Sequence, residues 1–115
     1  MAPIDERQNL PLTEAAFYIL LCLASGPKHG YAILKGVETL SEGRILLSTG
    51  TLYGGLKRFL KWDWIRRVNG KEADGSGRPR KGYALTEKGR LILNAEIARL
   101  KNLVKTARIH NPQGA

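Results

Sequence analysis

The pattern of hydrophobic and polar positions first predicts two helices in the N-terminal third of the chain. After Thr13, a good N-cap, residues 14–24 are apolar almost all round, so this helix should lie at the centre of the core. A second helix is predicted from about residue 29 or 30 to residue 40, because apolar side chains recur on one side at spacings of three. Gly36 weakens a helix by about 1 kcal/mol relative to alanine, so we expect it to pack closely against a neighbour.

Residues 48–62 predict a third helix with two different faces, capped by Ser48 or Thr49. Its apolar side consists of Leu52, Leu56, Phe59 and Leu60. Hydroxyls, one aromatic ring and two cations occupy much of the remaining surface: Thr49, Thr51, Tyr53, Lys57 and Arg58. Hydroxyl groups can bond phosphates or base edges, and Lys and Arg supply positive charge, so this face suits a nucleic-acid groove.

Two short strands are predicted next, over residues 65–69 and 81–85. The glycine-rich segment 70–80 between them would be the long, basic tip of a β-hairpin. The candidates there for contacts to phosphates or to the minor groove are Lys71, Arg78, Arg80 and Lys81. The alternative interpretation of these residues is a solvated, mobile loop.

Thr86 is a good cap for a last, long helix over about residues 87–108, which would be near 33 Å long. Apolar residues spaced four, three, four and three form an a/d seam of about two heptads: Leu93, Ile97, Leu100, Val104 and Ala107. The seam could pack on the first helix of the same subunit. We favour a partner helix, because a helix of this length outruns a small core. Leu93→Asp or Ile97→Asp is then expected to leave a monomer.

The order helix-helix-helix-hairpin-helix predicts a mainly α fold with a small β-hairpin, namely a winged helix-turn-helix with a long C-terminal dimerisation helix. We expect residues 1–12 to be a flexible arm, residues 13–85 to be the DNA-binding domain, residues 86–109 to be the dimerisation helix and residues 110–115 to be a tail.

Charge supports a polyanionic partner. The net charge of the 115 residues is +9. Residues 44–82 hold ten Lys/Arg and three Asp/Glu, or +7, whereas residues 1–43 sum to −2 and residues 83–115 to +4. The excess therefore lies around the third helix, as expected for a nucleic-acid-binding surface. A solvated basic surface is the alternative.

Other functional classes find little support. There is no phosphate-cradling glycine loop with its lysine, no paired carboxylates and no Cys–His or Ser–His arrangement, so no enzyme is predicted. Cys22 is the only cysteine, and neither it nor His29 has companions at metal spacing, so no metal or cofactor is expected. The longest apolar run is too short to span a membrane and no secretion signal is visible, which predicts a cytoplasmic location.

Four motifs, in order, make the chain resemble the PadR family of bacterial transcriptional regulators. They are Leu12-Thr-Glu-Ala-Ala-Phe-Tyr-Ile-Leu20, Gly26-Pro-Lys-His-Gly-Tyr-Ala-Ile33, Gly50-Thr-Leu-Tyr53 with Leu56-Lys-Arg58, and Arg80-Lys-Gly-Tyr-Ala-Leu-Thr-Glu-Lys-Gly89. The second and third motifs together are specific, and the resemblance covers nearly all of residues 12–100. By its length the chain looks like the subfamily with a single C-terminal dimerisation helix.

The resemblance implies a homodimer that binds a roughly palindromic operator, usually as a repressor. It also implies that Tyr31 offers its hydroxyl to a phosphate, for which a core tyrosine is the alternative. Some members bind flat aromatic compounds at the dimer interface through an aromatic residue of the last helix, but this chain has no aromatic residue after Tyr83. Asp63-Trp64 stands where the family usually has Gly and an aliphatic residue, and Gly82 stands where an aromatic is common.

The leading hypothesis is therefore a dimeric, sequence-specific repressor that carries Ser48 and the exposed face of residues 48–62 into the major groove. A small-molecule effector would act by moving the two wings relative to each other, although no effector site is evident in the sequence. Trp62 and Trp64 could line a small-molecule pocket, and an anchor for the hairpin is the favoured alternative. The runner-up function is a winged-helix module that binds protein or RNA without operator specificity.

Overall fold

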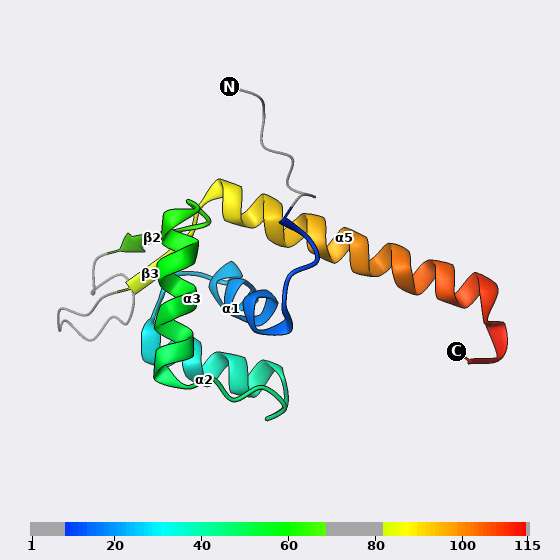
Figure 1. Ribbon diagram of the computed structural model, residues 1–115, viewed down its shortest axis with the longest axis horizontal. Helices are drawn as coiled ribbons and strands as arrows, with labels where there is room; N and C mark the ends of the chain where they lie inside the picture. Colours follow the sequence, from blue (N-terminus) through cyan, green and yellow to red (C-terminus); the bar gives the residue numbers. More distant parts are fainter. Residues whose placement is uncertain (1–8, 69–81, 115) are drawn as a thin grey trace, which may run out of the picture.

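The computed structural model describes residues 9–68 and 82–114. Within these residues, four α-helices and three short strands follow each other along the chain (Figure 1). Their bounds are α1 Glu14–Ala24, β1 Lys28–His29, α2 Gly30–Leu40, α3 Thr49–Lys61, β2 Ile65–Val68, β3 Gly82–Leu85 and α5 Glu87–His110, and a 3-10 turn, η2, covers Pro112–Gly114. This confirms the mainly helical winged helix-turn-helix fold. None of the helices in these two ranges could cross a membrane.

Each of the four helices begins with a side-chain cap. The oxygens of Thr13, Ser48 and Thr86 and the Nδ1 of His29 accept hydrogen bonds from backbone amides of the first turns. Such caps satisfy amide groups that have no partner inside a helix. Ser48, rather than Thr49, is thus the cap of α3, and His29 acts as a helix cap.

The sheet has the antiparallel order β1-β3-β2. Strands β2 and β3 form the predicted hairpin, with Ile65 opposite Leu85 and Val68 opposite Gly82. Strand β1 was not predicted, because its two residues are too few to show a periodicity. Lys28 of β1 pairs with Tyr83 of β3. The predicted loop and its candidates Lys71, Arg78, Arg80 and Lys81 lie outside the described residues.

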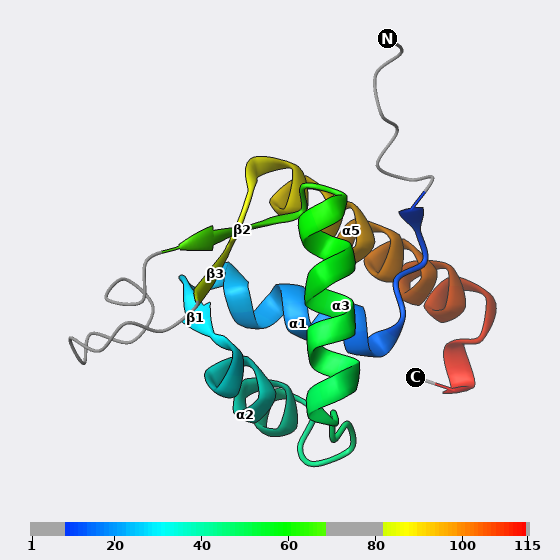
Figure 2. The same cartoon turned by 60° about the vertical axis from the view of Figure 1, so that its left-hand side comes forward.

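The core is built around α1, which lies behind α3 and beside α2 (Figure 2). Ile19, Leu20 and Leu23 of α1 are buried with apolar residues of α2, α3, the sheet and α5. At Gly36 of α2, an added Cβ would lie 2.7 Å from the Sγ of Cys22. This confirms that the glycine permits close helix packing and that Cys22 is a buried core residue.

The turn between α3 and β2 is fixed to the start of α5. The amide of Thr86 donates to the carbonyl of Trp64, and its hydroxyl donates to the carbonyl of Asp63 at 2.6 Å. A Cβ at Gly89 would overlap the Trp64 carbonyl, so α5 touches the turn without a side chain between them. The C-terminal end of α3 is therefore held against α5.

Helix α5 has two halves with different surroundings. Leu93 is 2% exposed and belongs to the core of its own subunit, and Ile97 packs against the same core. This placement corrects the assignment of Leu93 to a partner seam, since the first two turns of the helix lie over α1 and the sheet. Further along, Leu100, Val104 and Ala107 are exposed, on the half of α5 that extends away from the other helices (Figure 1).

The predicted arm is docked at its C-terminal end. The amide of Leu12 donates to Oε2 of Glu96 at 2.8 Å, and Glu96 is buried on α5. The same carboxylate pairs with Arg99 one turn later. Residues 9–12 thus lie along α5, whereas residues 1–8 lie outside the described residues.

Candidate nucleic-acid interface

Helix α3 has one buried side and a broad exposed side. Its buried residues are Leu52, Gly55, Leu56 and Phe59, which confirms most of the predicted apolar side. In Figure 2, α3 crosses in front of α1. The first turn of α3 lies beside α2, and the sheet lies to one side of the helix. The remaining surface of α3 is open to a partner.

The N-terminus of α3 offers backbone groups to an anion. The Ser48 oxygen accepts the Thr51 amide at 3.1 Å, and the Ser48 hydroxyl donates to the Thr51 oxygen at 2.9 Å. The Leu52 amide donates to the Ser48 carbonyl, so the amides of Thr49 and Gly50, which precede it, have no partner within the helix. Free amides at the positive end of a helix dipole are a favourable place for a phosphate.

The exposed residues of α3 lie on two sides of the helix. Thr49 and Tyr53 border a hollow shared with Tyr31 of α2, and Tyr53 and Lys57 border a groove shared with β2 and β3. We call this surface of Thr49, Tyr53 and Lys57 the wing side. Thr51 and Arg58 border a cavity on the opposite flank, which we call the arm side because residues 9–13 form its other wall.

Tyr53 packs inside the subunit and also keeps part of its side chain exposed. Its hydroxyl lies against the backbone of Gly30, where an added Cβ would overlap the phenol ring. Nearly half of the side chain nonetheless remains exposed. The ring therefore packs against the first turn of α2 while one edge faces outward, which fixes its direction without burying it.

Tyr31 is an exposed residue, which removes the alternative of a core tyrosine. It is the second residue of α2, beside the N-terminus of α3, and the Nζ of Lys35 lies 5.7 Å from the centroid of its ring. A cation over the ring adds positive charge next to the hydroxyl. Tyr31, Thr49 and Tyr53 therefore come together, as required for one binding surface.

Arg67 is a candidate contact that sequence reasoning missed. It is exposed on β2 and borders a groove of about 290 Å³ together with Tyr53 and Lys57. Burial raises the pKa of the Tyr83 hydroxyl in the same groove above its ordinary value. The signal was present as the adjacent pair Arg66-Arg67 in a predicted strand, but only the sheet places Arg67 beside α3.

Two glycines are also part of this surface. A Cβ added at Gly50 would have no neighbour within 4 Å, and one at Gly54 would meet only the guanidinium of Arg58, at 3.8 Å. Neither glycine has a positive φ, so neither is required by the backbone. The absence of side chains at Gly50 and Gly54 lets an external partner approach the α3 backbone.

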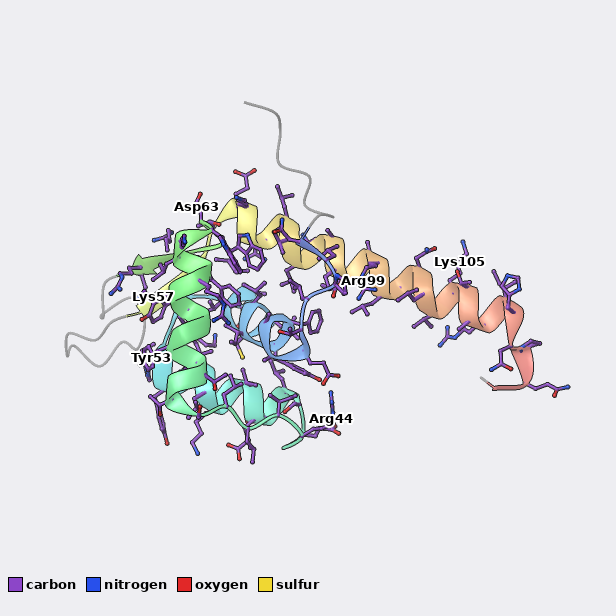
Figure 3. All side chains as sticks on the ribbon, viewed as in Figure 1. Arg44, Tyr53, Lys57, Asp63, Arg99 and Lys105 are labelled. Atoms are coloured by element: carbon purple, nitrogen blue, oxygen red, sulfur yellow. The ribbon has the colours of Figure 1, made fainter. Side chains whose placement is uncertain are left out.

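Figure 3 shows where several polar and charged side chains project from the ribbon. Tyr53 and Lys57 project from the flank of α3 toward the strands, whereas Arg44 lies near the turn after α2 and Lys105 lies far along α5. Arg44 pairs with Glu14 at 2.6 and 3.0 Å, and its guanidinium holds the pKa of that carboxyl below its usual range. Arg44 is therefore engaged in linking the α2–α3 turn to α1 rather than available on the α3 surface.

Comparison with known proteins identifies relatives of this architecture. Residues 19–95 match the family described as the transcriptional regulator PadR-like family. The chain is 38% identical over 94 residues to an uncharacterized 37.1 kDa protein in transposon TN4556 of Streptomyces fradiae. That match covers 79% of this chain but spans only 25% of the relative.

Several solved structures have a fold similar to that of this chain. A PadR-like transcription factor from Bacteroides fragilis is 32% identical with a TM-score of 0.64, and the alignment covers 81% of this chain and 85% of that one. A PadR family transcription regulator from Clostridium difficile R20291 is 26% identical with a TM-score of 0.70, covering 85% and 98%. Bacillus subtilis PadR, solved in complex with operator DNA, shares the fold at 22% identity and a TM-score of 0.60, covering 71% and 45%.

Proposed function

Because this chain belongs to the PadR-like family of transcriptional regulators, we propose that it binds a palindromic DNA operator as a homodimer and represses transcription. The observation that carries the proposal is the exposed surface of α3. Free amides at its N-terminus, the open glycines 50 and 54 and the wing-side residues Tyr53 and Lys57 lie together next to Tyr31 and Arg67.

Contacts to phosphates and contacts to base edges would have different consequences for DNA binding. Lys57, Arg67 and Tyr31 would bind phosphates and set the register of the protein on the duplex. Thr49, Thr51 and Tyr53 would reach base edges from the first turns of α3 and give sequence preference. Arg58 would contact the backbone from the arm side. Lys71, Arg78, Arg80 and Lys81 remain wing candidates on sequence grounds alone.

Dimerisation would use the half of α5 beyond the core. Leu100, Val104 and Ala107 continue the a/d seam that Ile97 begins, and they are exposed in the single chain. Two subunits joined there would place two copies of α3 in successive major grooves, about 34 Å apart on one side of the duplex. Repression, rather than activation, is proposed because the chain resembles PadR repressors. A regulator that binds DNA would work in the cytoplasm.

The test is binding to the DNA immediately upstream of the protein's own gene, compared with scrambled DNA of equal length, at about 50 and 200 mM salt. Specific recognition predicts a preference for the upstream fragment that survives at higher salt, because the salt-dependent term is shared by all sequences. Thr51→Ala and Tyr53→Phe should then reduce that preference.

A matched pair of charge variants tests the placement of the duplex. Lys57→Gln should weaken binding to both fragments and lower the slope of log affinity against log salt by about 1. Lys105→Gln removes the same charge far along α5 and should leave the slope unchanged. If both fragments bind equally and binding vanishes with salt, or if the two variants behave alike, α3 is not an operator-reading helix here. A preferred structured RNA or protein would then support the alternative winged-helix module.

A further inference from the structure

The segment that precedes α1 adjoins both α3 and α5. Leu10 borders a cavity together with Ala95 and Ala98 of α5. Residues 11–13 border the cavity on the arm side, whose other walls belong to α1 and α3. In Figures 1 and 2 this blue segment runs from α5 to the start of α1. We call residues 9–13 the bridging segment, because they share one cavity with α5 and another with α3.

A buried carboxylate ties the bridging segment to α5. The backbone amide of Leu12 donates to Oε2 of Glu96 at 2.8 Å, and the Glu96 side chain is buried. The guanidinium of Arg99 donates to both oxygens of the same carboxylate. A charge at this depth requires well-placed partners, and hydrogen bonds to an ionised group are stronger than those between neutral groups. The contact between Leu12 and Glu96 is therefore a specific link between the two ends of the chain.

The bridging segment has open space on two sides. The cavities that it borders have volumes of about 240 and 460 Å³. Atoms that line a cavity lack packing contacts on that side, so van der Waals attraction holds the segment less firmly than a core strand. Leu10 and Leu12 are only half-buried. The hydrogen bond to Glu96 therefore contributes much of what fixes the segment in place.

Glu96 also marks the point at which α5 leaves the domain. The buried residues of this helix are Gly89, Ile92, Leu93 and Glu96. Thr86, about 15 Å back along the axis, is bonded to the turn after α3. If only the start of α5 were fixed, a tilt of about 10° there would move Val104 by about 5 Å, which exceeds the ~3.4 Å rise of one base pair. The contact at Glu96 opposes such a tilt.

We propose that Glu96 is a positioning residue, which holds the bridging segment against α5 and thereby fixes the angle between α5 and α3. In a two-fold dimer joined along α5, that angle sets the distance between the two copies of α3. Glu96 would thus determine which half-site spacing of the operator the dimer accepts, without contacting DNA. The effect on spacing rests on the proposed function, whereas the link between Leu12 and Glu96 can be measured on the free protein.

Two substitutions at Glu96 separate the link from the charge. Glu96→Gln removes the charge but keeps a side-chain oxygen that can accept the Leu12 amide. Glu96→Leu removes both, and a buried apolar side chain of similar size is compatible with a stable fold. Hydrogen exchange of the Leu12 amide in the free protein should be at least about tenfold faster in Glu96→Leu than in Glu96→Gln.

A second route loosens the bridging segment and leaves Glu96 unchanged. Leu10→Ser removes the half-buried apolar side chain that borders the cavity at α5. It should speed exchange of the Leu12 amide and alter the spacing preference as Glu96→Leu does. Leu91→Ser is the matched control, because it removes a leucine from an exposed position on the same helix, and it should change neither quantity.

The separation of the two copies of α3 can be measured without DNA. Lys61→Cys places a thiol at the exposed end of α3, and Cys22 is buried, so a spin label attaches at residue 61. Pulsed electron paramagnetic resonance should give a narrow distribution of distances between the two labels when Glu96 is present. With Glu96→Leu the distribution should broaden or shift by about 5 Å, the displacement expected for the tilt.

The next measurement uses the upstream DNA site with its half-site spacing changed by one base pair in either direction. The wild type and Glu96→Gln should prefer one spacing roughly tenfold over the others, whereas Glu96→Leu should bind all of them within about threefold. If Glu96 only stabilised the fold, Glu96→Leu would weaken binding at every spacing alike and would leave the preference unchanged. Circular dichroism checks that each variant is folded.

The outcomes keep the two proposals apart. An unchanged spacing preference in Glu96→Leu, or equal exchange of the Leu12 amide in Glu96→Leu and Glu96→Gln, would overturn the positioning role. An altered distance between the labels in a protein without any DNA preference would overturn the proposed function and leave the positioning of α3 in place. A monomeric protein would overturn both the proposed dimer and the control of spacing.

Discussion

At the scale of single residues, Asp63 explains a departure from the PadR pattern. It follows α3 with a φ of 62°, in the left-handed region that favours glycine. Asp is one of the side chains that tolerates this region, so it can occupy this turn, where the sequence pattern of the family usually has Gly. The carbonyl of Asp63 also accepts the Thr86 hydroxyl, so the surrounding structure holds the conformation.

Asp63→Gly is expected to raise the free energy of unfolding by about 0.5–1 kcal/mol, because it relieves left-handed backbone strain at an exposed position. Asp63→Ala should lower the free energy of unfolding, since alanine keeps the Cβ and loses the polar side chain. Urea unfolding of the three proteins checks the order. If Asp63→Gly is less stable than the wild type, the aspartate side chain stabilises the fold by more than the left-handed backbone destabilises it.

Glu96 is a buried residue whose charge is retained. Its side chain is 2% exposed, yet hydrogen bonds from Arg99 and from the Leu12 amide hold the pKa of its carboxyl below the ordinary value, against the opposing effect of burial. The ordinary value, about 4.3, applies to the unfolded chain. Ionised Glu96 therefore stabilises the fold above that pH, and this contribution is lost as the pH falls through the lower folded-state pKa.

The stability advantage of the wild type over Glu96→Gln should accordingly be largest near neutral pH and should shrink progressively below about pH 4.5. The two free energies of unfolding, measured by denaturant titration at several pH values, give the difference directly. A constant difference between wild type and Glu96→Gln across this range would contradict the assignment.

At the scale of elements, α3 is a helix with weak intrinsic preference that is held by its surroundings. It contains three glycines, each costing about 1 kcal/mol relative to alanine. The Ser48 cap and the burial of Leu52, Leu56 and Phe59 offset that cost. A Cβ added at Gly55 would lie 3.7 Å from Ile19, which is an ordinary van der Waals contact, and one at Gly50 would meet nothing within 4 Å, so packing inside the subunit requires neither glycine.

Gly50→Ala should therefore separate stability from binding. The protein should become more stable by up to about 1 kcal/mol, because alanine is the better helix former and the site is open. Operator binding should weaken by about 1–3 kcal/mol, the scale of one misread base pair, if the α3 backbone approaches DNA there. Thermal unfolding and DNA titration measure the two effects, and unchanged DNA affinity would show that Gly50 is not at the contact.

At the scale of the whole molecule, α5 is longer than the core it covers. Its 24 residues extend about 36 Å, and its second half projects beyond α1, α2 and α3 (Figure 1). Leu100, Leu103 and Val104 are exposed there. Exposed apolar residues that share one helix face are typical of association surfaces, which supports the proposed dimer.

Leu100→Asp combined with Val104→Asp should give a folded monomer, because these side chains are 38% and 49% exposed in the single chain. Leu91→Asp is the matched control, at 48% exposure on another face of the same helix, and should leave the dimer intact. Leu93→Asp should instead unfold the protein, since it places a charge in the core. Sedimentation and circular dichroism together check all three.

The monomer should also bind the upstream fragment much more weakly than the dimer, because half of the contacts and their fixed spacing are lost. An intact dimer in the Leu100/Val104 variant would show that the subunits associate through another surface.

Local chemistry was sufficient for much of this protein. The sequence predicted Thr13 and Thr86 as caps, the apolar side of residues 52–60 and the two strands that pair residues 65–68 with residues 82–85, because capping and hydrophobic periodicity act over a few neighbouring residues. The motifs around Tyr31 and Tyr53 likewise indicated the family that the comparisons confirm.

Only the tertiary structure decided which exposed residues share a surface. The a/d spacing of α5 is the same at Leu93 and Leu100, yet one is core and the other is open, because the domain ends between them. Thr51 and Tyr53 are two residues apart on α3 and face a pocket and a groove on opposite flanks, since neighbouring elements meet the helix there. A sequence period fixes which residues share a helix face, whereas the packing of distant segments determines what that face meets.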